Sequence, residues 1–202
     1  MPKEVAPSTA FNASPNPIAE RIPPGQTVTK LFPVLHAGAV PDVPLASWRF
    51  RVFGHVETPL EFTWEDMLKL PSQSLHTDIH CVTGWSKLDT DWEGIPTRAI
   101  WERIEPQNGV THVLVHAHPD FMTNLTVEDF LAPTSIFAHR FGGAPLEPVH
   151  GGPMRLVVPH RYFWKSAKWV SGIELATVDR PGSWEDRGYH MRGDPWREER
   201  YW

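Results

Sequence analysis

The stretch HCVTGWSKLDTDWEG, residues 80–94, determines how the rest of the chain is interpreted. It contains Cys81, the only cysteine, directly after a strand-like run at residues 74–79. Gly84 follows shortly, and a glycine lets a ligand approach the backbone closely. A thiol at such a strand-to-loop junction is a candidate metal ligand or nucleophile. The alternative is a buried free cysteine that packs as a small hydrophobic residue.

The composition describes one globular domain without a general attraction for polyanions. The 202 residues are 41% hydrophobic and 21% charged, and the formal net charge is −5. This charge does not favour nucleic acids or anionic membranes, so any bound anion needs a local basic cluster. The 21 prolines and 10 tryptophans are unusually many, which favours short strands and packed loops over long helices. A single cysteine forms no internal disulfide.

The N-terminal region, residues 1–30, is rich in proline, serine and asparagine and shows no periodicity. We interpret it as an extended arm, flexible or draped over a single domain formed by residues 31–202. The sequence has no run of ~20 apolar residues that would span a membrane. It also has no apolar signal core and no paired arginines near its start. These features predict a cytoplasmic protein.

Hydrophobic patterns predict a mixed α+β domain that is rich in sheet, with short helices and long ordered loops. Strands are indicated at residues 48–53, 74–79, 112–116, 135–139, 156–158 and 170–177. Short helices are predicted at 63–70, where Thr63 and Asp66 form a capping-box pair, at 97–104, and at 125–130 with Thr126 as cap. Residues 94–96, Gly-Ile-Pro, are predicted to form a turn.

A second stretch, HGGPMRLVVPHRYFWKSAKW at residues 150–169, concentrates positive charge in an otherwise acidic protein. Guanidinium, ammonium and hydroxyl groups together suit a phosphate, because they donate several hydrogen bonds to its oxygens. The alternative is a basic surface hairpin solvated by water. The neighbouring apolar residues would fix the cluster on a rigid element, which favours a binding site. Its members are His150, Arg155, His160, Arg161, Lys165, Ser166 and Lys168.

Other kinds of site find less support in the spacing of residues. His112 and His116 on one strand would lie roughly 13 Å apart, too far to share a zinc ion. No Gly-x-Ser-x-Gly elbow and no nucleotide-binding glycine loop occurs. A cysteine hydrolase that pairs Cys81 with His80 or His116 stays an open alternative, because catalytic partners need not be near in sequence.

The cysteine stretch, the loop ending at His36 and the basic stretch resemble, in order and spacing, the sulfite oxidase-like molybdopterin-dependent oxidoreductases. The match is closest to small bacterial members and extends over residues 32–202. The resemblance implies that family's molybdopterin-binding fold and a molybdenum–molybdopterin cofactor. It implies Cys81 as the metal ligand and catalytic residue, and a soft thiolate suits such a centre. The positions that match contacts to the pterin or its phosphate are His36, His150, Arg155, Ser166 and Lys168.

The chain departs from the family's sulfite oxidases where those enzymes hold sulfite. Val34 stands in place of an arginine, and residues 82–86 read Val-Thr-Gly-Trp-Ser without arginine. Charge complementarity selects a small dianion, so these differences argue against sulfite as the substrate. We expect two-electron oxygen-atom transfer on another small substrate. Trp85, Thr123 and Asn124 are expected in the pocket wall. The chain carries no haem domain, so we expect a separate haem or flavin protein as electron-transfer partner. The alternative function is a molybdopterin-binding carrier or electron-transfer module without substrate turnover.

Overall fold

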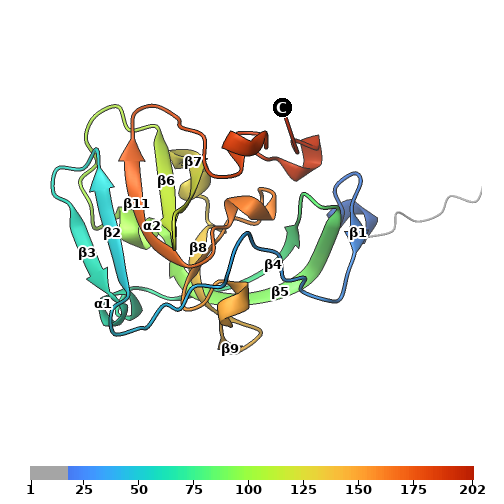
Figure 1. Ribbon diagram of the computed structural model, residues 1–202, viewed down its shortest axis with the longest axis horizontal. Coiled ribbons are helices and arrows are strands. Elements are labelled where there is room, and N and C mark those ends of the chain that lie inside the picture. The colour runs from blue at the N-terminus through green and yellow to red at the C-terminus, as the bar shows by residue number, and fades with distance from the viewer. Residues whose placement is uncertain (1–17) are drawn as a thin grey trace, which may run out of the picture.

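The computed structural model describes residues 18–202 and shows two β-sheets connected by short helices and long loops (Figure 1). Strands supply most of the regular structure, which confirms the predicted sheet-rich α+β class. Among the described residues, no helix is both long enough and apolar enough to cross a membrane.

One sheet has five strands in the order β3-β2-β11-β6-β7. β11 pairs in parallel with β2 and antiparallel with β6, so the last long strand of the chain lies in the middle of this sheet. The strands predicted at 48–53, 112–116 and 170–177 are confirmed, whereas the sequence patterns do not indicate β3 or β7. The bounds are β2 (Arg49–Gly54), β3 (Leu60–Thr63), β6 (His112–Ala117), β7 (Phe121–Thr126) and β11 (Val170–Ala176).

The other sheet has six strands and follows the path β1-β5-β8-β10, with β4 beside β5 and β9 beside β8. β4 and β5 pair antiparallel on either side of the cysteine loop, residues 81–84. β10 lies within the basic stretch, so both stretches singled out in the sequence belong to this sheet. The bounds are β1 (Thr27–Val28), β4 (Gln73–His80), β5 (Trp85–Pro96), β8 (Ile136–Phe141), β9 (Ala144–Pro145) and β10 (Arg155–Val157).

The turn predicted at residues 94–96 is wrong, because these residues belong to β5. Gly94 pairs with Ala138 of β8. A side chain at Gly94 would place its Cβ 2.2 Å from the carbonyl oxygen of Phe137. Glycine is therefore required here by close strand approach and not by a turn. α2 (Thr97–Trp101) begins directly after the strand and is shorter than the predicted helix 97–104.

The caps predicted for two short helices are confirmed. Thr63 accepts a hydrogen bond from the Asp66 amide and Asp66 accepts one from the Thr63 amide, which makes a capping box before α1 (Trp64–Leu68). Thr126 accepts a hydrogen bond from the Asp129 amide before α3 (Val127–Phe130). Residues 125 and 126 belong to β7, so α3 begins later than the predicted helix 125–130.

The main hydrophobic core lies between the two sheets. Phe50 and Ile173 from the five-stranded sheet belong to the same buried cluster as Phe137 and Leu156 from the six-stranded sheet. Phe50 and Phe137 make an edge-to-face contact with ring centroids 4.8 Å apart. Cys81 belongs to a separate small cluster beside this core. The cysteine loop is therefore anchored at the margin of the core.

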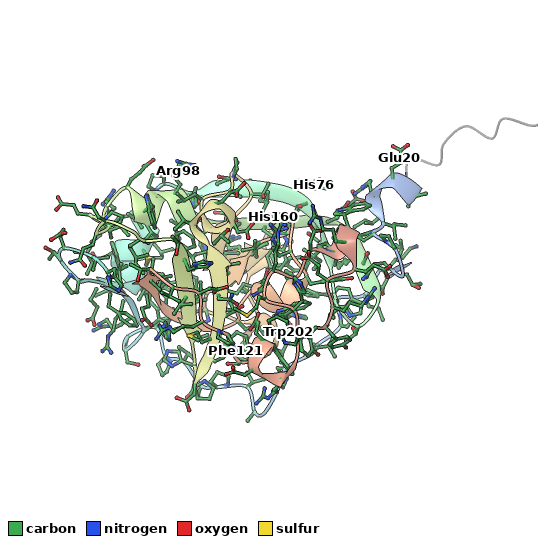
Figure 2. The ribbon with its side chains drawn as sticks, turned by 90° about the horizontal axis from the view of Figure 1, so that it is seen from above. Glu20, His76, Arg98, Phe121, His160 and Trp202 are labelled. Atoms are coloured by element: carbon green, nitrogen blue, oxygen red, sulfur yellow. The ribbon has the colours of Figure 1, made fainter. Side chains whose placement is uncertain are left out.

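Segments near both ends of the described chain lie against the cysteine loop. β1 pairs in parallel with β5, so part of the predicted arm joins the sheet. Glu20, labelled in Figure 2, lies near the start of the described part of this arm. Residues 1–17 of that arm lie outside the described residues. The C-terminal segment, residues 184–202, crosses the top of the view in Figure 1. A bridge between Tyr189 and Tyr201 closes this segment on itself.

Candidate active site

A cavity of about 330 Å³ lies where the cysteine loop, the basic stretch and the C-terminal segment meet. Five of the residues implied by the resemblance line this cavity, and they come from the loop before β2, the loop after β4 and the region from β10 to β11. The fold therefore gathers residues that are far apart in the sequence. These residues are His36, Cys81, Arg155, Ser166 and Lys168.

Cys81 occupies the first position after β4, in a tight loop closed by its own backbone. Its amide donates to the Trp85 carbonyl over 2.8 Å, and the Gly84 amide donates to the Cys81 carbonyl over 3.0 Å. Gly84 has φ +93, which favours glycine. The Cys81 Sγ lies 3.2 Å from Thr83 Oγ1. Burial raises the pKa of the Cys81 thiol, and the hydrogen bond with Thr83 opposes this effect.

Side chains from both terminal segments hold the backbone of the cysteine loop. Gln26 Nε2 donates to the Cys81 carbonyl over 3.1 Å, and Ser86 donates to Gln26 Oε1 over 3.3 Å. Arg200 donates to the Val82 carbonyl, and its guanidinium lies 5.2 Å above the Tyr162 ring. The positive charge of Arg200, like the hydrogen bond with Thr83, partly opposes the burial that raises the pKa of the Cys81 thiol. These contacts restrain the loop that presents the thiol.

Arg155 supplies a buried positive charge at the cavity. Its side chain is almost fully buried and donates to the carbonyls of His150 over 2.7 Å and Ser166 over 2.8 Å. The guanidinium lies 4.2 Å above the Phe163 ring. Burial lowers the pKa of Arg155 below its ordinary value, but a guanidinium stays charged at neutral pH. None of the described carboxylates lies within 4.0 Å of it, so an incoming anion would be its only counter-charge.

Lys168 is the second cation at the cavity, and its hydrogen bonds also go to carbonyl groups. Its Nζ donates to the Val149 carbonyl over 2.7 Å and to the Leu35 carbonyl over 2.9 Å. Burial, followed by repulsion from Arg155, lowers the pKa of Lys168 to about 7. A bound anion would favour the charged form of this ammonium group. Arg155 and Lys168 thus place two basic side chains at one cavity, a donor set that suits an anion.

The remaining predicted cofactor contacts differ in position. Ser166 accepts a hydrogen bond from the Val158 amide over 2.9 Å, so its hydroxyl also ties the loop to β10. His36 is exposed at the cavity and donates through Nδ1 to the Gly38 carbonyl over 2.9 Å. His150 is not among the residues that line the cavity and stacks on Phe32, with ring centroids 4.0 Å apart. Its buried Nδ1 has no hydrogen-bond partner within residues 18–202.

An aromatic wall beside Cys81 was not anticipated from the sequence. Trp164, Trp184 and Tyr189 all line the cavity, and the Tyr189 ring centroid lies 5.1 Å from those of the two tryptophans. Arg187 completes this wall, with its guanidinium 5.2 Å above the Trp184 ring. Burial raises the pKa of the Tyr189 phenol. Most of the wall comes from the non-periodic C-terminal segment, whose only sequence signal is its aromatic content.

Of the three residues predicted for the pocket wall, only Trp85 lines the cavity. Its buried Nε1 has no hydrogen-bond partner within the part of the chain that the structure describes. Thr123 and Asn124 instead contact a buried ion pair, in which Lys165 Nζ lies 2.5 Å from Glu185 Oε1. Glu185 accepts a hydrogen bond from Trp164 Nε1 over 3.0 Å. This ion pair therefore positions one residue of the aromatic wall.

The two histidines considered as partners for a cysteine hydrolase are engaged elsewhere. His80 Nδ1 is hydrogen-bonded to Ser86 Oγ over 2.8 Å. His116 Nε2 lies 3.1 Å from Glu174, on the five-stranded sheet. Neither His80 nor His116 is thus hydrogen-bonded to Cys81 as a catalytic base would be.

The donor set fits a cofactor that carries both a metal and a phosphate. One part of the cavity presents the Cys81 thiol, and another presents Arg155 and Lys168, which have no carboxylate partner within the described part of the chain. Trp85 Nε1 adds a buried polar atom at the cavity that has no hydrogen-bond partner among residues 18–202. Buried charges and polar groups normally have such partners, so these groups are arranged for a ligand.

Comparison with known proteins agrees with this interpretation. The family model for the oxidoreductase molybdopterin binding domain matches residues 37–184. The sulfane dehydrogenase SoxCD from Paracoccus pantotrophus shares the fold, with a TM-score of 0.66 and 15% identity over 92% of this chain and 58% of that chain. These matches confirm the resemblance to sulfite oxidase-like molybdopterin oxidoreductases and the molybdenum–molybdopterin cofactor.

Two relatives illustrate the range of similarity. The uncharacterized oxidoreductase YuiH from Bacillus subtilis is 47% identical over 90% of this chain and 92% of its own length. The protein-methionine-sulfoxide reductase catalytic subunit MsrP from Campylobacter jejuni is 27% identical over 69% of this chain, which spans 52% of MsrP. The chain thus covers nearly all of one relative and about half of the other. It belongs to the oxidoreductase molybdopterin-binding domain family and is a molybdopterin-dependent oxidoreductase.

Proposed function

We propose that this protein catalyses two-electron oxygen-atom transfer on a small organic sulfur oxide and not the oxidation of sulfite. The aromatic wall beside Cys81 is the observation that carries this proposal. Trp164, Trp184 and Tyr189 offer apolar surface next to the thiol, and residues 82–86 contain no arginine. A neutral oxide has an apolar body for such a wall, whereas the wall offers a sulfite dianion a single cation among the described residues, Arg187.

The relatives support the choice of a sulfur oxide. The matched proteins include a protein-methionine-sulfoxide reductase catalytic subunit from Ralstonia nicotianae, which is 26% identical over 77% of this chain. The chain spans 50% of that relative, so the likeness leaves the substrate as a proposal. The cavity of about 330 Å³ limits the reacting group to a small side chain or molecule once a cofactor shares the space.

The residues of the cavity have separate roles in this proposal. When bound, the molybdenum–molybdopterin group supplies the two-electron redox chemistry. Cys81 would hold the metal through its thiolate, while Arg155 and Lys168 would hold the phosphate of the pterin. A phenol has an ordinary pKa of about 10 and burial raises that of Tyr189 further, so Tyr189 is protonated at neutral pH and can donate a hydrogen bond to the oxide oxygen.

Metal content tests the assignment of the cofactor site. Protein from a host that makes molybdopterin should contain about one molybdenum per chain, and Cys81→Ser should lose most of it, because an alcohol replaces the soft thiolate ligand. Thr83→Ser is the matched control, since it keeps a hydroxyl beside the sulfur and should retain the metal. Wild-type protein without molybdenum would contradict the assignment of the site.

A substrate panel tests the reaction. With reduced methyl viologen as electron donor, the protein should reduce dimethyl sulfoxide, methyl phenyl sulfoxide or methionine sulfoxide. With ferricyanide as acceptor, sulfite should be oxidised far more slowly. Replacing Trp184 by alanine should raise KM for the aromatic sulfoxide more than for dimethyl sulfoxide, because the wall contacts the larger group. Faster sulfite oxidation than sulfoxide reduction would refute the proposal.

A separate electron-transfer protein would supply the electrons. Several relatives are named as subunits, among them the putative protein-methionine-sulfoxide reductase subunit YedZ1 from Azospira oryzae, 28% identical over 89% of this chain. This naming supports a partner for the present chain.

A further inference from the structure

Three aromatic side chains of the C-terminal segment are exposed. Trp196 is 50% exposed, Tyr201 58% and Trp202 73%. A folded protein usually covers much of a tryptophan, because burying a large ring is favourable. Three exposed rings within one short segment therefore mark a surface that differs from the rest of the protein.

Two of the exposed rings contact residues next to the site. Tyr201 lies edge-to-face against Tyr189, with centroids 5.1 Å apart, and Tyr189 lines the cavity. Trp196 lies edge-to-face against His80, with centroids 6.2 Å apart, and His80 directly precedes Cys81. Only one residue thus separates the exposed surface from the cavity or from the metal-ligand position. These contacts connect the exposed rings to the cavity and to the residue next to Cys81.

The same segment carries unpaired positive charge. Arg187, Arg192 and Arg197 are exposed, and within residues 18–202 no carboxylate lies within 4.0 Å of their guanidinium groups. The exposed carboxylates of the segment are Asp186 and Glu198, and Glu198 lies 3.9 Å from Arg200. The chain as a whole has a formal net charge of −5. With its buried and half-buried groups the segment holds five carboxylates and four arginines. The three exposed arginines nevertheless outnumber the two exposed carboxylates, so they present unpaired positive charge on an acidic protein.

We propose that Trp196, Tyr201, Trp202, Arg192 and Arg197 form the docking surface for an electron-transfer protein whose redox group lies within an acidic face. Tryptophan, tyrosine and arginine dominate the binding energy of protein interfaces. Opposite charges on the two partners would speed their encounter. The rate of electron transfer falls steeply with distance, so a carrier gains most by docking directly over the cysteine loop.

The electron balance of the proposed reaction requires such a carrier. Reduction of a sulfoxide breaks the S–O bond, consumes two electrons and two protons, and releases water. A carrier that gives one electron at each encounter is itself oxidised by one electron, so two encounters complete a turnover. The docking surface rests on the proposed function only in its need for an external electron source.

A double charge-reversal variant tests the surface in the molybdenum-loaded protein. In Arg192→Glu/Arg197→Glu, the rate constant for oxidation of a reduced acidic flavodoxin should fall roughly tenfold or more at low ionic strength. The rate with reduced methyl viologen should stay unchanged, because this small donor needs no docking surface. Trp202→Ala should also slow the flavodoxin reaction, with little effect on its salt dependence. Added salt should slow wild type and bring it towards the double variant.

The matched control is Arg98→Glu/Arg103→Glu, which makes the same change in net charge elsewhere. Both arginines are exposed at α2 or just after it, and Figure 2 shows Arg98 well away from Trp202. This control should retain most of the flavodoxin rate. Equal loss in both double variants would mean that net charge alone acts, and it would overturn the docking surface.

Direct binding separates this inference from the proposed reaction. Calorimetric titration with oxidised flavodoxin needs no turnover and should show weaker binding to Arg192→Glu/Arg197→Glu than to wild type. Unchanged binding and unchanged flavodoxin rates would overturn the inference. Faster exchange with a basic cytochrome than with the flavodoxin would also overturn it. Sedimentation in which wild type self-associates and Trp202→Ala does not would assign the surface to a second copy of this chain. A wild type that binds flavodoxin but reduces no sulfoxide would instead count against the proposed reaction alone.

Discussion

Replacing Lys165 by methionine should destabilise the protein by about 3–5 kcal/mol, because the change leaves a carboxylate buried without its counter-charge. The side chains of Lys165 and Glu185 are both 0% exposed, with 2.5 Å between Nζ and Oε1. Lys165 also donates to Asn124 Oδ1 over 2.6 Å. Without the ammonium group, Glu185 would keep only neutral donors, such as Trp164 Nε1 at 3.0 Å.

Thermal unfolding followed by tryptophan fluorescence measures this loss. For a chain of this size, about 2–4 °C in Tm corresponds to each kcal/mol, so Lys165→Met should lower Tm by about 6–20 °C at equal molybdenum content. Lys165→Met/Glu185→Gln should recover more than half of the loss, because glutamine removes the unpaired charge and still accepts from Trp164. A double variant is informative since the two partners are in direct contact.

An exposed ion pair provides the control. Lys69 Nζ lies 2.9 Å from Asp66 Oδ1, with the two side chains 73% and 45% exposed. Lys69→Met should therefore change stability by less than about 1 kcal/mol. The reasoning would be refuted if Lys165→Met were no less stable than Lys69→Met, or if the double variant at residues 165 and 185 were as unstable as the single one.

Three further outcomes are expected. Gly94→Ala should destabilise the protein by about 1–3 kcal/mol or more in urea unfolding, because its Cβ would meet the Phe137 carbonyl oxygen; an unchanged midpoint would show that β5 and β8 can separate freely. In cofactor-free protein the pKa of Lys168 is lowered from 10.5 to about 7, so the unfolded state binds more protons between these values and stability should rise with pH across this window. Lys168→Met should remove the rise between pH 7 and the pKa of Arg155 at about 9, and its advantage over wild type should be largest below pH 7; an unaltered pH profile would contradict this. Arg200 donates to the Val82 carbonyl, so Arg200→Gln should speed hydrogen exchange of the cysteine-loop amides and promote loss of molybdenum. Arg200→Lys should partly restore both properties. Unchanged exchange would show that the loop is stable without this contact.

Elements specified by short-range rules were predictable from the sequence. The strand before Cys81 and the strand at 112–116 follow from local alternation and apolar runs, and the Thr63 and Thr126 caps follow from short polar spacings. Gly94 shows where such rules fail. Its neighbours resemble a turn, because glycine and proline usually mark one, but the close approach of β8 requires glycine within a strand.

The candidate site divides in the same way. Cys81, Arg155 and Lys168 were predicted from the sequence and line one cavity, because thiolate and cationic chemistry reside in the side chains themselves. The other basic residues of that stretch do not line it: His160 and Arg161 lie against Asp129, and Lys165 pairs with Glu185. The aromatic wall was not identified, because Trp184 and Tyr189 lie in a segment without periodicity. Thr123 and Asn124 were placed in the wall from polar character alone, and the structure instead places them against the buried ion pair of Lys165 and Glu185.

The sequence by itself determined the chemistry available to this protein: one thiol, a concentrated basic stretch and many rigid aromatic rings. Only the tertiary structure decided which of these groups meet. Strand pairing and the contacts of the two terminal segments bring Cys81 to the same cavity as Arg155 and Tyr189. The physical reason is that side-chain chemistry depends on residue type and helix caps depend on residues close in sequence. The juxtaposition of distant segments depends instead on backbone pairing and core packing, which the local pattern does not encode.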